Sequence, residues 1–299
     1  MSTQINASAP ENEVSPTEST KSVAARPWAF RDLPPFSGVA LKLLNLLDQD
    51  DVAMKTVSDL IRADPAISAE ILRVSNSAMY GVSREIDNVA HALVVLGTDT
   101  VKRLALTVSL GRFCGEFLHD RSLRACWDHS IACALICQEL AIILDEPKDR
   151  AYTAGLLHDI GRLAILSCYP TEYGTLLSVS SENEFDELEA ERELFEIDHC
   201  AAGTILAREW NLPDDFVEAI STHHSPQVSD ALIPALVAAG TAVADRLGYN
   251  IMRIENFERS ILDVIQELPL EDFETSAERL ENLKPAIEIA LKSISPARR

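Results

Sequence analysis

Apolar side chains recur every three to four residues along most of this chain, starting near residue 39. That spacing places them on one face of a helix, whereas a half-buried strand would alternate apolar and polar positions. No segment alternates convincingly and no internal repeat is visible, so the predicted fold class is all-α. The predicted helical segments are residues 39–47, 52–61, 65–80, one on either side of Gly97-Thr98, 127–143, 152–168, 198–210, 213–224 and 231–247.

Local signals set several of these helix ends. Asp64-Pro65 is expected to start a helix, because aspartate caps the first turn and proline needs no N–H acceptor there. Segments 127–143 and 152–168 are apolar on nearly every side, which predicts two helices buried in the centre of the protein. Residues 251–299 are expected to form an acidic helical extension, in which Pro285 kinks or divides the last helix.

Two segments differ in composition from the helical core. Residues 1–27 are rich in Ser, Thr, Glu, Asn and Pro and lack an apolar period, so we expect a disordered tail. A run of Asp and Glu residues crowds the stretch between residues 180 and 198. We interpret this run as the solvated face of a helix.

The charge balance restricts the partners of the protein. The 299 residues include 47 Asp and Glu against 26 Lys and Arg, which gives a formal net charge of −21. Such a field repels phosphate backbones, so nucleic acid is not an expected partner. The six cysteines form no Cys-x-x-Cys pair and lie mostly among Ala, Leu and Ile, which indicates small buried residues in a reducing cytosol.

Neither a secretion signal nor a membrane span is visible. The N-terminus lacks a basic start followed by an apolar stretch. The longest apolar run, residues 231–244, is too short to cross a bilayer and contains Pro234. We therefore expect a soluble, cytoplasmic protein without a membrane partner.

Histidines and aspartates interrupt the apolar positions of five successive helical segments. The candidate metal ligands are His129, His158, Asp159, His199, His223, His224 and Asp245. Each would point toward the core, where a polar group is costly unless it is paired or bound to a metal. Imidazole and carboxylate ligands together suit iron, manganese, nickel, cobalt or zinc rather than calcium. The sequence therefore predicts a site for one or two divalent transition-metal ions, although each ring taken singly could also be a core histidine bonded to the backbone.

The adjacent pair His158-Asp159 is the centre of this pattern, and Arg162 completes the polar cluster of segment 152–168. Neighbouring residues on a helix diverge by about 100°, yet both side chains could reach ions lying between them, with the carboxylate bridging two. Such a pair of ions can activate water for phosphoester hydrolysis. In that case Asp159 and Arg162 are the catalytic candidates, the latter by neutralising phosphate charge.

The order of these residues resembles the H…HD…D signature of the HD superfamily, which His129, His158-Asp159 and Asp245 match. The other histidines match those of the HD-GYP phosphodiesterases: His199, His223 and His224. The preceding sequence is similar to the HDOD domain. The runs that carry this similarity are Leu33-Pro34-Pro35-Phe36, residues 60–66 (LIRADPA), 72–81 (LRVSNSAMYG), 91–97, 127–130 (WDHS) and 210–213 (WNLP).

The resemblance covers residues 28–248 and implies an order of parts. These are an N-terminal helical part (28–125), an HD-like helical bundle (126–248) and the acidic extension (249–299). It also implies a bacterial signal-transduction module that acts through protein partners, since HDOD domains are usually regarded as lacking the activity of their enzyme relatives. Here the metal positions are nearly complete, which favours a retained metal site.

Three departures from the phosphodiesterase pattern bear on activity. Ser225-Pro226 follows the histidine doublet where a glutamate and a Gly-Tyr-Pro loop are expected, Arg162 replaces the usual lysine, and Ala125 replaces an acidic ligand. They argue against a third metal and against a loop for cyclic-di-GMP. A regulatory module is the main prediction. The alternatives are a metal-dependent phosphohydrolase acting on a nucleotide or cyclic dinucleotide, and a di-iron oxygenase; the oligomeric state stays open.

Overall fold

The structure is a computed structural model that describes residues 33, 36–46, 52–114, 121–183, 186–224, 231–251 and 259–294. Within these ranges every regular element is a helix, which confirms the predicted all-α fold class. The predicted tail, residues 1–27, lies outside the described residues, as does the Ser225-Pro226 loop.

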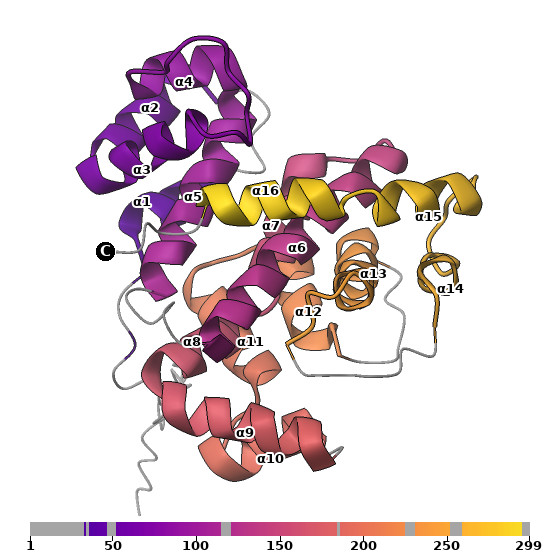
Figure 1. Cartoon of the computed structure of the whole chain (residues 1–299). Coiled ribbons are helices and arrows are strands. Elements are labelled where there is room, and N and C mark those ends of the chain that lie inside the picture. Colours follow the sequence, from indigo (N-terminus) through magenta and orange to yellow (C-terminus); the bar gives the residue numbers. More distant parts are fainter. Residues whose placement is uncertain are drawn as a thin grey trace, which may run out of the picture.

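The N-terminal helices lie together at one end of the molecule in Figure 1. They are α1 (Gly38–Leu44), α2 (Met54–Arg62), α3 (Pro65–Ser75), α4 (Val89–Leu96) and α5 (Thr98–Cys114). The predicted start of α3 is confirmed, since Asp64 Oδ1 accepts the backbone N–H of Ala66 at 2.9 Å and that of Ile67 at 3.0 Å. At its other end, the Asn76 side chain bonds both the N–H and the carbonyl of Ile86, each at 2.8 Å.

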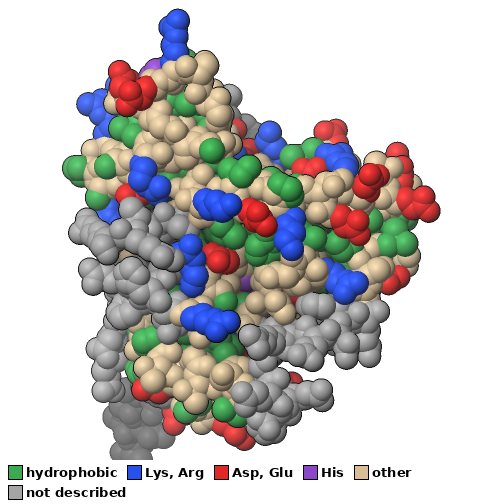
Figure 2. Space-filling model, in the orientation of Figure 1, with side chains coloured by type: hydrophobic (Ala, Val, Ile, Leu, Met, Phe, Trp, Pro, Cys, Tyr) green, Lys and Arg blue, Asp and Glu red, His purple; other side chains and the backbone are tan. Residues whose placement is uncertain are grey.

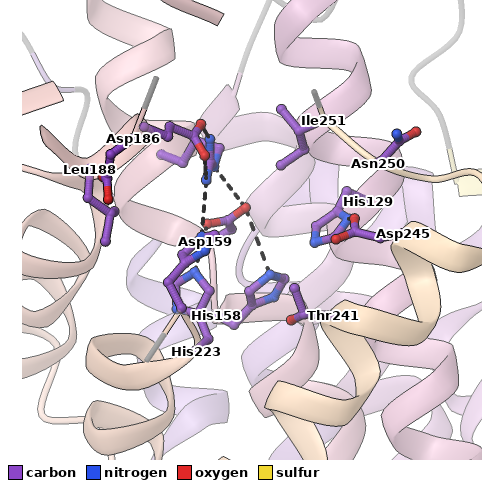
Figure 3. Close-up of a pocket in the computed structure, with 13 residues that line it drawn as sticks. His129, His158, Asp159, Asp186, Leu188, His223, Thr241, Asp245, Asn250 and Ile251 are labelled. Carbon is purple, nitrogen blue, oxygen red and sulfur yellow. Dashed lines mark hydrogen bonds and ion pairs between the residues drawn. The ribbon is translucent and has the colours of Figure 1, made fainter. Parts of the chain in front are cut away.

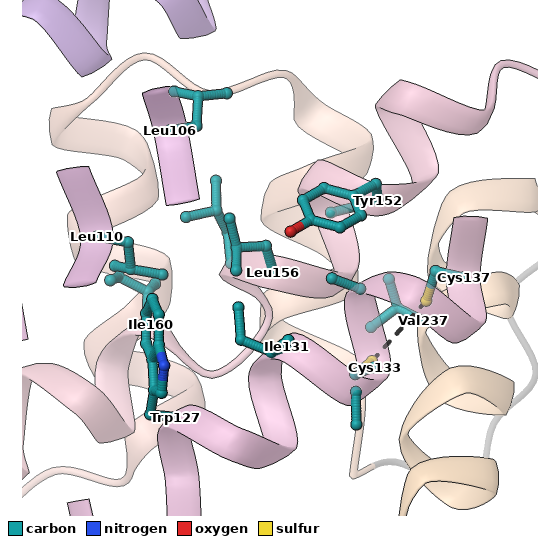
Figure 4. Packing of buried hydrophobic residues seen from close by; sticks show 14 of the residues in the cluster. Leu106, Leu110, Trp127, Ile131, Cys133, Cys137, Tyr152, Leu156, Ile160 and Val237 are labelled. Carbon is teal, nitrogen blue, oxygen red and sulfur yellow. Dashed lines mark hydrogen bonds between the residues drawn. The ribbon is translucent and has the colours of Figure 1, made fainter. Parts of the chain in front are cut away.

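A second group of helices includes the longest one, α6. The group comprises α6 (Arg121–Ile143), α7 (Lys148–Leu157), α8 (Ile160–Cys168), α11 (His199–Glu209), α12 (Asp214–Thr222) and α13 (Leu232–Arg246). In this group, α7, α8 and α13 pack against α6, while α11 packs on α8 and α12 packs on α11 and α13. Figure 4 shows Trp127 and Ile131 of α6 among side chains from α5, α7 and α8, and Cys137 beside Val237 of α13. The predicted buried helix at residues 127–143 is therefore confirmed, with a start several residues earlier.

The remaining described helices lie on the outside of this core. They are α9 (Pro170–Asn183), α10 (Glu187–Phe195), α14 (Ile261–Ile265), α15 (Phe273–Glu281) and α16 (Lys284–Ile294). Figure 1 shows α15 and α16 following one another across α6, and Pro285 in the first turn of α16 accounts for the predicted division. Arg73 of α3 donates to the carbonyl of Ser293 at 2.8 Å, so α16 also contacts the N-terminal part. Acidic side chains gather around α15 in Figure 2.

Among the described residues, one helix, α6, is long and apolar enough to cross a membrane, by its length and composition alone. Of its most apolar window, 67% is buried inside the protein. The packing of α6 against six neighbouring helices accounts for its apolar surface.

Further predicted boundaries differ from the structure, and the helix expected over residues 65–80 already ends at Ser75. Segment 152–168, predicted as one helix, consists of α7 and α8, which are separated at His158 and Asp159. The expected border between the two parts of the domain, at residues 125 and 126, falls inside α6, because this helix already begins at Arg121. The other domain limits stay a prediction.

Candidate metal centre

Five helical segments bring the candidate ligands to one pocket. His129 lies in the middle of α6, His158 and Asp159 lie in the break between α7 and α8, and His223 caps the end of α12. Asp245 lies near the end of α13. Figure 3 shows these five side chains directed into a common pocket of about 300 Å³.

The break between α7 and α8 corrects the geometry expected for His158 and Asp159. The backbone of Asp159, at φ −101° and ψ 21°, departs from helical values. Because the chain turns here, the two side chains lie on the same side instead of diverging as neighbours on a helix would. His158 Nε2 lies 3.8 Å from Asp159 Oδ2.

Glycines allow the surrounding helices to approach closely. A Cβ atom on Gly161 of α8 would overlap the carbonyl oxygen of His199 and the backbone of Gly203 in α11. A Cβ on Gly155 of α7 would lie 2.9 Å from Cys137 Sγ, and one on Gly240 of α13 would lie 2.5 Å from the same sulfur. Bare backbone at these positions therefore sets the spacing of the helices that carry the ligands.

Four histidines share one arrangement, in which Nδ1 contacts an oxygen and Nε2 faces the pocket. Nδ1 of His129 lies 2.8 Å from the carbonyl oxygen of Tyr249, and Nδ1 of His158 lies 2.7 Å from that of Gly155. His223 contacts the carbonyl of Ile220 at 2.9 Å, and His199 contacts the carboxylate of Glu191 at 2.8 Å. A proton on Nδ1 leaves the lone pair of Nε2 for a ligand, which is the arrangement that metal-binding histidines adopt.

Three buried atoms of this group have no hydrogen-bond partner among the described residues. They are His158 Nε2, Asp159 Oδ1 and His223 Nε2. His223 Nε2 lies 3.3 Å from Asp159 Oδ1, and the residues are 7% exposed or less. Buried polar atoms without partners are costly. A cation among them would supply the missing interaction, so this donor set fits a metal ion.

Two sets of potential ligands share Asp159. Within each set, the ligand atoms lie within 4.8 Å of one another. The first set is His129, His158 and Asp159, and the second is Asp159, His199, His223 and His224. Six of the seven predicted ligands are thereby brought together.

Asp245, the seventh, belongs to neither set and lies 3.5 Å from Nδ1 of His129. Burial, together with Cys133 and Asp159, raises the pKa of Asp245 to about 7. Burial and the nearby His158 lower the pKa of His129 to about 4, which keeps this imidazole neutral and able to bind a metal. Asp245 therefore borders the pocket beside a ligand.

Arg162 lies in a buried network of carboxylates. Its Nε donates to Asp159 Oδ2 at 3.0 Å, and its two terminal nitrogens donate to Glu187. Nη1 also donates to the hydroxyl of Tyr173 at 3.3 Å, while Nη2 lies 3.1 Å from Nε2 of His199. These contacts use the five N–H groups of a guanidinium. The expected contact of Arg162 with a substrate phosphate therefore does not fit its surroundings, since each donor already faces the protein.

The acidic stretch before α11 was predicted to be a solvated face, and at two positions this prediction is wrong. Glu191 is fully buried and Glu187 is 9% exposed. Glu191 accepts the backbone N–H of His199 at 2.6 Å and the hydroxyl of Tyr173. Burial raises the pKa of Glu191, but His199 and Arg162 more than reverse this and lower it overall. The sequence signal was the spacing of four residues between the two glutamates, which puts both on the face of α10 that includes the buried Phe195.

We expect the substitution Glu191→Gln to lower the free energy of unfolding by about 2–3 kcal/mol, because a neutral amide cannot accept from all of the buried donors around it. Glu193→Gln, on the exposed side of the same helix, is the matched control and should change little. Denaturant unfolding of the two variants measures the difference. Equal stabilities would show that the Glu191 contacts contribute nothing.

Comparisons with known proteins agree with this fold. The family model of the HDOD domain matches residues 33–226. An "Uncharacterized protein" of Treponema pallidum is 23% identical over 284 residues, 91% of this chain and 54% of its own length. "Ribonuclease Y" of Mycoplasmoides gallisepticum is 25% identical over 76% of this chain and 38% of its own length. The chain thus spans about half, or less, of these curated relatives.

Solved structures with the same fold cover most of the chain. An "HDOD domain protein with unknown function" from Geobacter sulfurreducens superposes with a TM-score of 0.72 at 24% identity, covering 88% of this chain and 93% of that one. A "Putative signal transduction protein" from Marinobacter aquaeolei VT8 has a TM-score of 0.71 at 25% identity, covering 88% of this chain and 60% of that one. The family match, which extends over more than half of the residues, establishes that this chain belongs to the HDOD domain family.

Proposed function

We propose that this protein is a bacterial signal-transduction module of the cytoplasm that holds a divalent transition metal and acts through protein partners. The observation that supports the metal is the convergence of His158 Nε2, Asp159 Oδ1 and His223 Nε2, which are buried and lack hydrogen-bond partners among the described residues. The similarity to a solved signal transduction protein supports the regulatory role.

The residues that would hold the ion come from different helices. His129 belongs to α6, His158 and Asp159 to the α7–α8 break, and His223 to the end of α12. Iron, manganese, nickel, cobalt and zinc accept such mixed imidazole and carboxylate ligands. A bound metal supplies a Lewis acid. Its ligands would also tie α6 and α12 to the α7–α8 break, so its occupancy would change the rigidity of the surface that these helices present to a partner.

We expect His158→Ala to lower metal affinity more than about 100-fold, since even changes to groups that merely orient a ligand cost 10–100-fold. His91→Ala is the control, because His91 lies on α4 and contacts Asp87 at 3.2 Å. Equilibrium dialysis against Mn²⁺ followed by elemental analysis gives the affinity. Equal Mn²⁺ binding by the two variants would contradict the proposed ligand set.

A metal-dependent phosphohydrolase acting on a nucleotide or cyclic dinucleotide is the second candidate. Asp159 is common to both ligand sets, as a bridging carboxylate would be. The similarity to ribonuclease Y adds support, although the net charge of −21 disfavours nucleic acid as the substrate.

The lining of the pocket favours the regulatory role over hydrolysis. Asp186, Glu187 and Asp245 border it, and Arg162 is the one Lys or Arg side chain of its described lining. The carboxylates around Arg162 already compensate its charge, so a phosphate group would meet a negative field. Assaying the Mn²⁺-loaded protein with bis(p-nitrophenyl) phosphate separates the two candidates. Turnover that disappears in His223→Ala would establish hydrolysis, and absence of turnover in the loaded protein supports the regulatory module.

A further inference from the structure

We infer that this protein holds one metal ion rather than two, and that the guanidinium of Arg162 occupies the position of the second ion. The inference rests on the proposed metal site and concerns how many ions that site accepts. It follows from the different surroundings of the two ligand sets on either side of Asp159.

The first side of the site is open to an ion. His158 Nε2, Asp159 Oδ1 and His223 Nε2 lack hydrogen-bond partners among the described residues. His129 and His158 belong to the first set, with ring centroids 5.3 Å apart, and His223 of the second set lies next to them, with its ring centroid 5.0 Å from that of His158. Three or four ligands of this kind are enough for one transition-metal ion.

The second side is already occupied by a cation. Nη2 of Arg162 lies 3.1 Å from His199 Nε2 and 3.4 Å from His224 Nε2. Nε of Arg162 donates to Asp159 Oδ2, the carboxylate oxygen left over for a second ion. The guanidinium therefore contacts three of the four residues of this ligand set.

An imidazole nitrogen that contacts the guanidinium of Arg162 cannot bind a metal ion at the same time. A neutral imidazole has one unprotonated nitrogen, whose single lone pair in the plane of the ring can accept an N–H or bind a metal but not both. Nδ1 of His199 already contacts Glu191, so Nε2 is the nitrogen left for a metal. Nη2 of Arg162 lies 3.1 Å from this nitrogen, so its lone pair is not available to a second ion.

The guanidinium of Arg162 cannot easily lose its charge or move away from this position. A guanidinium does not deprotonate in proteins, and its side chain is 1% exposed. Glu187, Glu191 and Tyr173 hold its far side. A second ion would lie about 3.5–4 Å from the first, which is the space next to this fixed positive charge. A lysine, with a compact ammonium, could not span Asp159, Glu187 and His199 at once as the planar fork of arginine does.

Mn²⁺ binding followed by elemental analysis and EPR tests the inference without an activity assay. The wild-type protein should bind one Mn²⁺ per chain and show the resolved hyperfine lines of an isolated ion. His224→Ala, at the exposed edge of the second set, should still bind one ion. His223→Ala should lose it. Arg162→Gln, which removes the positive charge, should bind a second ion and show a broad, exchange-coupled spectrum.

Each result has a defined meaning. Two ions per wild-type chain with a coupled spectrum, one of them lost in His224→Ala, would overturn the inference and leave the proposed metal site intact. No bound Mn²⁺ in the wild-type protein would overturn both. If Arg162→Gln does not fold, the comparison of the wild-type protein with His224→Ala still decides the number of ions.

Discussion

Replacing Gly161 by alanine is expected to lower the free energy of unfolding by about 3 kcal/mol or more. The added methyl group would overlap the backbone of His199 and Gly203, and would lie 2.9 Å from the Cα atom of Gly203. Backbone cannot rotate away as a side chain can, so α8 and α11 must separate. This separation would also move His199 relative to Asp159, the residue that both ligand sets share.

Denaturant unfolding measures this effect, and Gly38→Ala provides the control. A Cβ on Gly38 in the first turn of α1 meets nothing within 4 Å. Its stability should stay unchanged or rise by about 0.4–1 kcal/mol, because alanine restricts the unfolded chain. A Gly161→Ala protein as stable as Gly38→Ala would show that α8 and α11 are not in close contact.

Replacing Arg162 by methionine should destabilise the metal-free protein by about 3–5 kcal/mol, which is typical when one partner of a buried ion network is removed. Asp159, Glu187 and Glu191 would keep their buried negative charges without the cation that balances them. Burial raises the pKa of Asp159, but Arg162 and His158 more than reverse this and hold it well below its usual value. Removing the cation therefore makes ionised Asp159 costly.

Arg259→Met is the matched control, because Arg259 pairs with Glu267 on the surface, where their side chains are 57% and 49% exposed. Loss of a surface pair of this kind should cost no more than about 1 kcal/mol. Thermal or denaturant unfolding in a chelator compares the two variants. Similar losses would mean that Arg162 is solvated and not held inside the network.

Much of the fold follows from local sequence patterns. The capped start of α3 at Asp64-Pro65 and the separation of α4 from α5 at Gly97 depend on residues whose backbone preferences are strong. The burial of α6 follows from its apolar residues on all sides. The helix predicted over residues 198–210 is also found, as α11, and Asp198 caps its start by accepting the N–H of Ala201 at 2.7 Å.

The break at His158 and Asp159 could not be predicted from the same signals. Apolar residues continue through both helices, and both are buried on nearly every side, so the periodicity does not change at the break. The break is accompanied by a tertiary contact, since Gly161 at the start of α8 lets this helix approach the backbone of α11 closely. Local preference gives way to packing in such places.

Surface and interior carboxylates also look alike in sequence. Glu187 and Glu191 lie in a run whose other described carboxylates are largely exposed, and their burial depends on Arg162 and His199 from distant segments. The role of Arg162 likewise depends on distant segments. The sequence alone made it a catalytic candidate, because it follows closely after Asp159. Its partners determine its role, and they come from α9, α10 and α11.

The most direct test of this account is a crystal structure of the Mn²⁺-loaded protein with diffraction data collected at the manganese absorption edge. The account predicts one anomalous peak per chain, at bonding distance from His158 Nε2, Asp159 Oδ1 and His223 Nε2, with Arg162 still in contact with His199. No peak in the pocket would contradict the metal site. Two peaks on either side of Asp159, with Arg162 displaced, would contradict its single occupancy.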